Sequence, residues 1–342
     1  MHEISDEKPS SPVTSAKMHL FILNPKSFRQ EWKMEQVLSV INSIFDSTEN
    51  NNFKIHISRF PRDATGFIPA FACKLPEGTM LRVYAVGGDG ILFDCLNGII
   101  GLKNAELAAV PYGRTNNFIR GFGRNEINNF KNISRQINAP VIPIDVMRCA
   151  NNYALEYCAI GIEAEAVRYA EKFRQRMDKG NPIKRWISRH MYTWHYFAGG
   201  LAAAFDKRLL HQEYDVQIDD EKFKGLFWGL SIFNGPYYGG NLHPSNISMP
   251  NDGILDMLVI RGKRFLLTYC LLPLYVTGRY KSSQRNISLK QGRNIKICSK
   301  DILVVSIDDN TFYENELNIE LLPGAVNFAD ASKSGYRGVS ND

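Results

Sequence analysis

Hydrophobic residues in the first third of the chain alternate between short continuous runs and segments with helical spacing. The continuous runs have the length of buried strands and occupy residues 18–23, 53–58, 81–86 and 107–110. The segments between them carry apolar residues three or four positions apart and occupy residues 32–45, 65–73, 91–101 and 116–121. Strands that alternate with helices in this way predict a doubly wound parallel sheet, with ligands bound at the carboxyl ends of its strands.

The pattern changes beyond about residue 143, where short strand-like runs are bounded by turn residues. Residues 144–150 and 153–160 predict a hairpin around Asn151 and Asn152. Further strand-like runs occupy residues 214–218, 223–233, 254–260, 294–299 and 302–307. Two helical stretches, 164–210 and 263–277, interrupt them. We therefore expect an α/β domain followed by an antiparallel β-sandwich domain with helical insertions.

These changes in pattern also predict where the domains begin and end. Residues 1–17 offer nothing to bury, which predicts a disordered tail. The α/β domain is expected over residues 18–143 and the β-sandwich domain over 144–325. Residues 326–342 form a C-terminal segment that we expect to return to the first domain.

Composition narrows the class of protein without choosing a function. A chain of 342 residues is long enough for two cored domains, and 44% hydrophobic residues exclude wholesale disorder. The net charge of +6 is compatible with phosphates, nucleic acid or anionic lipid as partners. The longest apolar runs, 191–205 and 265–276, are broken by glycine or proline and are shorter than the roughly 20 residues of a spanning helix. With no signal-peptide pattern, a cytoplasmic protein is expected.

The six cysteines show neither metal-ligand spacing nor a Cys-x-x-Cys motif. If the turn of the predicted hairpin is Asn151-Asn152, position 149 lies opposite position 154. Cys149 and Cys158 are then out of register, and no disulfide is expected between them.

The most informative local feature is Gly87-Gly88-Asp89-Gly90, which joins a predicted strand to a predicted helix. Such a turn leaves backbone N–H groups unpaired and lets a ligand approach closely, a geometry that binds phosphate. Asp89 would repel a bare phosphate, so it points to a metal ion or a nucleotide hydroxyl as intermediary. The alternative is a plain βα turn in which Asp89 caps the helix.

A second turn of the same kind follows the next strand. Residues 111–118 contain Gly113, and Asn116 is expected to cap the following helix. Turns on successive parallel strands would lie side by side at the carboxyl edge of the sheet, where a nucleotide is expected.

Five sequence blocks, taken in this order and spacing, resemble the diacylglycerol kinase catalytic-domain family, which includes bacterial soluble lipid kinases and sphingosine and ceramide kinases. They are Asn24-Pro25-Lys26, Gly87-Gly88-Asp89-Gly90, and residues 111–118, 234–240 and 251–256. The resemblance covers roughly residues 18–330. It implies transfer of the γ-phosphoryl group of ATP to a lipid hydroxyl, such as that of diacylglycerol, with Mg²⁺ as cofactor and the nucleotide between the two domains.

The resemblance also implies roles for individual residues. The first glycine turn would hold the ATP phosphates, and Asp89 would serve their metal-linked charge. The implied nucleotide-binding residues are Ser58, Gly87, Gly88, Asp89, Gly90, Ile91, Gly113, Arg114, Thr115 and Asn116. The implied Mg²⁺ ligands are Asp252 and the backbone carbonyls of Met249 and Ile254, although Asn-Asp-Gly is also a good hairpin turn.

Three departures from the family pattern are chemical. Ile91 replaces a Thr, and Asn117 replaces a carboxylate in a motif where Arg114 also replaces a Thr. Asn310 replaces the Glu that the family is proposed to use as general base, a function typically worth ~100- to 10,000-fold in rate. The candidate catalytic positions are Asp89, Asp308 and Asn310, with Asp309 and Glu314 as substitutes for the missing Glu.

These departures keep two alternatives open, which are a pseudokinase that binds nucleotide or lipid without turnover and an NAD kinase-like enzyme. Residues 164–190 carry eight Lys or Arg residues, which indicates either a face for anionic headgroups of a membrane surface or a solvated helix. Nucleic-acid binding is disfavoured because no recognised motif accompanies this charge. The oligomeric state, a homodimer included, stays open.

Overall fold

The computed structural model describes residues 17–28, 30–46, 52–179, 181, 192–206, 209, 212–239, 242–261, 274–275, 277–279 and 286–339. The predicted N-terminal tail lies outside these ranges except for Lys17, which begins the first strand. So do the second half of the basic stretch and almost all of the predicted helix at 263–277.

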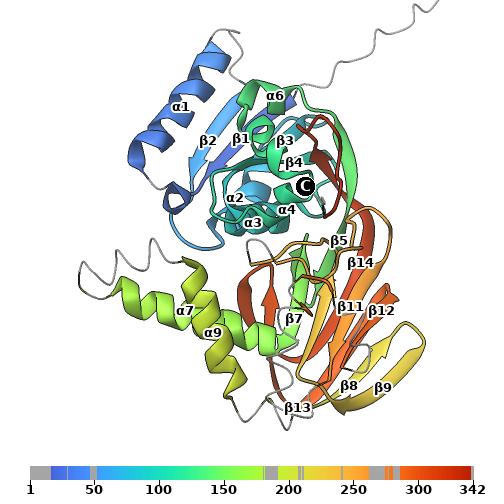
Figure 1. The fold of residues 1–342 in the computed structure, drawn as a ribbon. Helices are drawn as coiled ribbons and strands as arrows, with labels where there is room; N and C mark the ends of the chain where they lie inside the picture. Colours follow the sequence, from blue (N-terminus) through green and yellow to red (C-terminus); the bar gives the residue numbers. More distant parts are fainter. Residues whose placement is uncertain are drawn as a thin grey trace, which may run out of the picture.

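The first half is built on parallel strands with helices between them, as predicted (Figure 1). The strands are β1 (Lys17–Leu23), β2 (Phe53–Ile57), β3 (Met80–Gly87) and β4 (Ala105–Pro111), in the spatial order β2-β1-β3-β4. The helices that follow them are α1 (Glu31–Asp46), α2 (Asp63–Ala72), α3 (Asp89–Ile99) and α4 (Asn117–Arg120). The strand order reverses between β1 and β3, and such a switch point is where open α/β sheets bind ligands.

Several short elements in this half were not predicted. They are the 3-10 turns η1 (Pro25–Ser27) and η2 (Arg124–Glu126) and the helices α5 (Ile127–Lys131) and α6 (Ile133–Ile137). Each is five residues or fewer, which is too short for a helical period to stand out in the sequence.

The second half is an antiparallel β-rich region, as predicted. Its main strands, in spatial order, are β12 (Ile287–Gly292), β11 (Leu255–Ile260), β10 (Gly229–Phe233), β7 (Tyr157–Gly161), β13 (Asn294–Ile307) and β14 (Asn310–Ala329). The hairpin of β8 (Glu213–Ile218) and β9 (Glu221–Leu226) pairs with β13. Helices α7 (Ile162–Asp178) and α9 (Tyr192–Ala204) pack against each other beside these strands (Figure 1).

β14 connects the two halves. It pairs with β13, then with β5 (Val141–Cys149), and its residues Asn327 and Phe328 run parallel to β4. Within the described residues, fourteen strands therefore belong to one hydrogen-bonded network. β12 and β14 were not predicted. The run 223–233 divides into β9 and β10, whereas the runs 294–299 and 302–307 merge into β13 across a register shift between Cys298 and Leu303.

The hairpin predicted after residue 144 differs from expectation. β5 pairs with β6 (Asn152–Ala154) so that Cys149 lies opposite Asn152, and the turn is formed by Ala150 and Asn151. The chain then bends at Leu155 before β7 begins. Cys149 and Cys158 remain free thiols among the described residues. The register assumed for position 149 was wrong, because Cys149 lies opposite Asn152. The two thiols are neighbours, since burial and then a hydrogen bond with the Cys158 thiol raise the pKa of Cys149.

Candidate functional site

The two glycine turns contact each other through their backbones. The Gly87 carbonyl accepts hydrogen bonds from the N–H groups of Tyr112 at 2.7 Å and Gly113 at 2.8 Å. A Cβ atom on Gly113 would lie 2.3 Å from the Gly88 Cα, and one on Gly88 would lie 2.9 Å from the Gly113 Cα. Glycine at both positions therefore permits the side-by-side arrangement that the sequence predicted.

Asp89 joins the first turn to the second. Its Oδ2 accepts a hydrogen bond from the Thr115 hydroxyl at 2.5 Å, and its Oδ1 accepts one from the Asn117 N–H at 2.7 Å. Burial raises the pKa of Asp89, and these two donors act in the opposite direction. The N-cap of α3 is Gly88, so the alternative in which Asp89 caps this helix is wrong.

Asn116 is the N-cap residue of α4, as predicted, but its side chain makes no capping hydrogen bond. It has a left-handed backbone with φ of 49°, and its amide bonds back to Gly113, accepting from N–H at 3.1 Å and donating to the carbonyl at 2.9 Å. The Arg120 Nε donates to the Thr115 carbonyl at 2.6 Å. Burial lowers the pKa of Arg120, as does nearby Arg124, whereas the charge of Asp89 raises it. An arginine thus stands beside the second turn.

The other residues predicted to bind nucleotide differ in how far their side chains are exposed. The Ile91 side chain is 2% exposed and packs in the core, where its Cγ2 would lie 2.7 Å from a Cβ on Gly87. Arg114 is exposed. Ser58 follows β2, and its hydroxyl donates to the Phe60 carbonyl at 3.3 Å. Ser27 was not predicted, and its Oγ would also lie 2.7 Å from a Cβ on Gly87. The sequence feature that could have indicated Ser27 was the turn that follows the first strand.

The predicted catalytic segment is the tight turn between β13 and β14. Asp308 and Asp309 both have left-handed backbones, with φ of 42° and 65°, which a two-residue hairpin turn requires. The Asp308 carboxylate accepts hydrogen bonds from the N–H groups of Leu155 at 2.8 Å, Glu156 at 3.1 Å and Tyr157 at 3.0 Å. Burial raises the pKa of Asp308 to about 7 despite these donors. These three hydrogen bonds to Asp308 stabilise the bend before β7.

The other two residues of this segment are also engaged. The Tyr157 hydroxyl donates to Asp309 Oδ1 at 2.8 Å. The Asn310 Nδ2 donates to the carbonyls of Asp308 at 3.0 Å and Ile307 at 3.4 Å. The amide of Asn310 therefore bonds within its own turn.

Glu156 was not predicted as a site residue. The charges that act on it include Asp308, in the turn between β13 and β14, and Asp89, in the first glycine turn. Glu156 is 4% exposed, and neither of its carboxylate oxygens has a hydrogen-bond partner in the described part of the chain. Burial raises its pKa well above the ordinary value, and the charges of Asp308 and Asp89 raise it further. The signal in the sequence was an acidic residue inside the otherwise apolar run 153–160.

The C-terminal segment also reaches the place where the two halves of the chain meet, which we call the junction. The N–H groups of Arg337 and Gly338 donate to the Gly121 carbonyl at 2.8 and 3.0 Å, so the segment lies against the end of α4. The Tyr336 hydroxyl is buried and lacks a hydrogen-bond partner among the described residues. Burial and then the charge of Glu156 raise the pKa of Tyr336 well above its ordinary value.

The predicted metal turn lies beside β5. Asp252 is exposed, and its Oδ1 accepts the Ile254 N–H at 3.1 Å. Partial burial raises the pKa of Asp252, as do the charges of Asp256 and Asp145. The Asp145 carboxylate accepts the N–H groups of Gly253 at 2.8 Å and Gly324 at 2.7 Å, which fixes the turn to β5 and β14. One carboxylate with two carbonyl oxygens is a ligand set that suits Mg²⁺.

The comparison with known families agrees with this geometry. Residues 18–149 match the diacylglycerol kinase catalytic domain, and residues 159–330 match the YegS C-terminal NAD kinase beta sandwich-like domain. The chain belongs to the diacylglycerol kinase catalytic-domain family.

Relatives of this diacylglycerol kinase family member carry kinase names. Proteins of Staphylococcus aureus strains JH9 and N315, each named "Putative lipid kinase", are 24% identical over 71% of this chain and 75% of their own length. A solved structure of a diacylglycerol kinase from Bacillus anthracis is 20% identical, covers 91% of this chain and 96% of its own, and has a TM-score of 0.62. At that identity the likeness establishes the fold. A yeast NADH kinase structure is a distant likeness, at 9% identity and a TM-score of 0.47.

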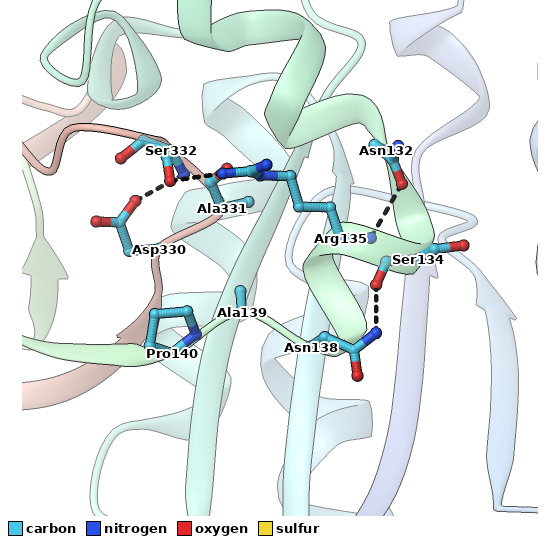
Figure 2. Close-up of a pocket in the computed structure, with 9 residues that line it drawn as sticks. All are labelled: Asn132, Ser134, Arg135, Asn138, Ala139, Pro140, Asp330, Ala331 and Ser332. Atoms are coloured by element: carbon cyan, nitrogen blue, oxygen red, sulfur yellow. Dashed lines mark hydrogen bonds between the residues drawn. The ribbon is translucent and has the colours of Figure 1, made fainter.

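Two surface pockets of this family member lie away from the predicted residues. The pocket in Figure 2 has a volume of about 400 Å³ and lies between α6 and the segment that follows β14. Arg135 crosses it and donates to the carbonyls of Ala331 at 2.5 Å and Ser332 at 2.9 Å. A second pocket, of about 480 Å³, is lined by residues of β5, β8, β13 and β14. No residue predicted to bind nucleotide or metal lines either pocket.

Three or more His, Cys, Asp or Glu side chains do not gather in a metal-binding cluster within the described ranges. No helix in those ranges is long and apolar enough to cross a membrane.

Proposed function

We propose that the protein is an ATP- and Mg²⁺-dependent lipid kinase that transfers the γ-phosphoryl group to a lipid hydroxyl such as that of diacylglycerol. The observation that carries this proposal is the backbone contact between Gly88 and Gly113. It brings together two glycine turns and the N-terminus of α3 at the switch point of a parallel sheet, in a chain of the diacylglycerol kinase family.

The first turn can hold phosphate through its backbone. α3 has eleven residues, and its first N–H groups lack acceptors within the helix, so its N-terminus favours an anion. No described atom lies within 4 Å of a Cβ built on Gly90, which leaves the backbone approachable there. The exposed Arg114 would add positive charge, and the Ser27 hydroxyl beside Gly87 would add a donor.

Asp252 and the carbonyls of Met249 and Ile254 would hold Mg²⁺. When bound, the ion would neutralise charge on the phosphates during transfer. The chain itself supplies the rigid support, since Asp145 ties the neighbouring Gly253 to the sheet.

A membrane-facing surface follows from α7 and α9. Exposed cations on α7 include Lys172, Arg174 and Arg176. Leu201 on α9 and Phe205 just after it are exposed apolar side chains. Cations next to exposed apolar side chains suit the headgroup region of an anionic bilayer. We propose that this cytoplasmic enzyme docks there peripherally to reach its lipid.

The second candidate is a pseudokinase that binds nucleotide without turnover. It is favoured by the Asn310 amide, which bonds within its own turn, and by the three N–H groups that engage Asp308. Neither the Asn310 amide nor the Asp308 carboxylate is therefore placed as a free base. The two candidates differ in turnover, which an assay measures directly.

The test is phosphate transfer from Mg-ATP to diacylglycerol, monoacylglycerol, ceramide and sphingosine in mixed micelles, with NAD as a separate acceptor. We expect a lipid phosphate from the wild type. Gly90→Ala is expected to fold but to weaken ATP binding by at least about tenfold, since its methyl group occupies the approach to the backbone. Gly66→Ala, on α2, also meets no described atom within 4 Å and serves as the matched control.

ATP binding without a product from any lipid would establish the pseudokinase. Phosphorylation of NAD alone would establish an NAD kinase-like enzyme. Equal ATP affinity of Gly90→Ala and wild type would refute the assignment of the first turn to the phosphates.

A further inference from the structure

Glu156 is a buried carboxylate without the hydrogen bonds that burial normally requires. Its side chain is 4% exposed, and both Oε1 and Oε2 lack partners within the described residues. The backbone N–H of Tyr237 lowers its pKa slightly without forming a hydrogen bond of normal geometry. A buried polar group of this kind costs free energy and requires a specific explanation. Its neighbours indicate what that explanation is.

Glu156 lies where the two halves of the chain meet. Its N–H donates to Asp308 in the turn between β13 and β14, and its side-chain charge interacts with that of Asp89 in the first glycine turn. The N–H groups of Asn234 and Gly235 donate to its carbonyl at 2.8 and 3.0 Å. These bonds fix the backbone, so the position of the carboxylate is defined.

Glycine at position 235 leaves room for the Glu156 carboxylate. A Cβ on Gly235 would lie 2.6 Å from the Glu156 Oε2, so any larger residue at 235 would displace it. The Tyr336 hydroxyl is also buried without a partner in the described chain, and its pKa responds to the charge of Glu156. Glu156 thus offers an unpaired acceptor, and Tyr336, on which its charge acts, offers an unpaired donor. A hydroxyl group can satisfy both, since it donates one hydrogen bond and accepts others.

The other acidic residues of the junction are already engaged. Asp308 accepts three backbone N–H groups, and Asp309 accepts the Tyr157 hydroxyl. Asn310 carries an amide, which is not a useful base. Glu156 is the carboxylate of this group whose oxygens have no donor in the described chain.

We propose that Glu156 is the catalytic carboxylate that accepts the proton of the lipid hydroxyl, with Tyr336 orienting that hydroxyl. This inference rests on the proposed lipid kinase function. The hydroxyl oxygen forms a bond to the γ-phosphorus, and the bond from that phosphorus to the β,γ-bridging oxygen breaks. Its electron pair leaves with ADP. The hydroxyl proton moves to a Glu156 oxygen and then passes to solvent.

Electrostatics support this role. Burial and the charges of Asp308, Asp89 and Asp309 raise the pKa of Glu156, so the ionised carboxylate binds a proton more strongly than an ordinary Glu. The same shift favours the protonated carboxyl group, so a reaction that needs the ionised base should become faster as pH rises.

The test compares wild type, Glu156→Gln and Glu156→Asp in the lipid phosphorylation assay, with Glu77→Gln, an exposed Glu, as the matched control. Glu156→Gln should lower kcat by ~100- to 10,000-fold, the usual range for loss of a general base. ATP affinity, measured with a fluorescent analogue, should stay within about twofold, a change of less than 0.5 kcal/mol. The acid limb of the wild-type kcat profile should shift in Glu156→Asp and vanish in Glu156→Gln, which a merely structural role would not produce.

The inference fails while the proposed function stands if the wild type phosphorylates lipid and Glu156→Gln retains kcat within about threefold. An inactive wild type overturns both. If Glu156→Gln does not fold, Gly235→Ala tests the same point with the Glu retained, because its methyl group displaces the carboxylate. That variant should lower kcat at unchanged ATP affinity, and unchanged kcat would refute the role.

Discussion

The contact between the two glycine turns predicts a sharp difference between two Gly→Ala variants. In Gly113→Ala, the new Cβ would lie 2.3 Å from the Gly88 Cα and 2.8 Å from the Asn116 Oδ1. Carbon atoms in favourable contact are roughly 3.5–4.0 Å apart, so the turns would have to separate by about 1 Å. The new Cβ is bonded directly to the backbone and the Gly88 Cα is a backbone atom, so no side-chain rotation relieves this contact.

The magnitude follows from the groups that must move. Overpacking alone costs about 1–3 kcal/mol. Separation also stretches the hydrogen bonds to the Gly87 carbonyl and to Asp89, each worth about 0.5–1.5 kcal/mol. We expect Gly113→Ala to lower the free energy of unfolding by about 2–5 kcal/mol. Gly90→Ala meets no described atom within 4 Å and lies in α3, so it should raise this free energy by about 0.5–1 kcal/mol.

The assay is urea unfolding followed by circular dichroism, with the unfolding free energy extrapolated to water for each variant. The reasoning would be refuted if Gly113→Ala matched the wild type within about 0.5 kcal/mol, or if Gly90→Ala were destabilised as strongly. The first result would mean that the turns are not in contact, and the second would mean that the loss in Gly113→Ala is not specific to that contact.

Two further predictions concern buried carboxylates. Because the pKa of Asp308 is raised from 3.8 to about 7, the folded state holds its proton more tightly than the unfolded state. Between those pH values the unfolding free energy should therefore fall as pH rises, and Asp308→Asn should flatten this slope in urea titrations at pH 5, 6 and 8; an unchanged slope would contradict the assignment. Asp145→Asn loses an acceptor for Gly253 or Gly324 and should cost about 1–3 kcal/mol by the same method, whereas Asp252→Asn, which accepts one local bond on the surface, should cost about 0.5 kcal/mol or less. Equal losses would show that Asp145 does not hold the turn.

The first half of the fold could be predicted because its signals are local. The run 81–86 became β3, Met80–Gly87, and the glycine turn after it leads directly into α3. Both features depend on neighbouring residues in the chain. β14 was missed because its early residues are mostly polar and its buried alternation begins only at Leu317. Its place in the structure is set by β13, β5 and β4, which are distant in sequence.

The candidate site was likewise predicted in its local features and not in its long-range contacts. The sequence located both glycine turns and the β13–β14 turn, but it did not show what their side chains contact. Asp89 accepts a hydrogen bond from Thr115, and the side chain of Asn116, the N-cap residue of α4, bonds back to Gly113. Glu156 stood out in the sequence only as an acidic residue in an apolar run, and its contact with Gly235 could not be predicted because the two residues lie far apart in the sequence.

The grouping of acidic residues at the junction also limits where the chemistry can occur. Asp89 comes from the first half, whereas Glu156 and Asp308 come from the second, and their charges raise the pKa of Glu156 together. Neither half alone would create this environment, since each supplies only part of the charge. A proton or a cation near Glu156 lowers the repulsion among all three carboxylates. Uptake of a substrate proton at Glu156 is therefore favoured by the way the two halves pack, which ties the proposed proton transfer to the junction itself.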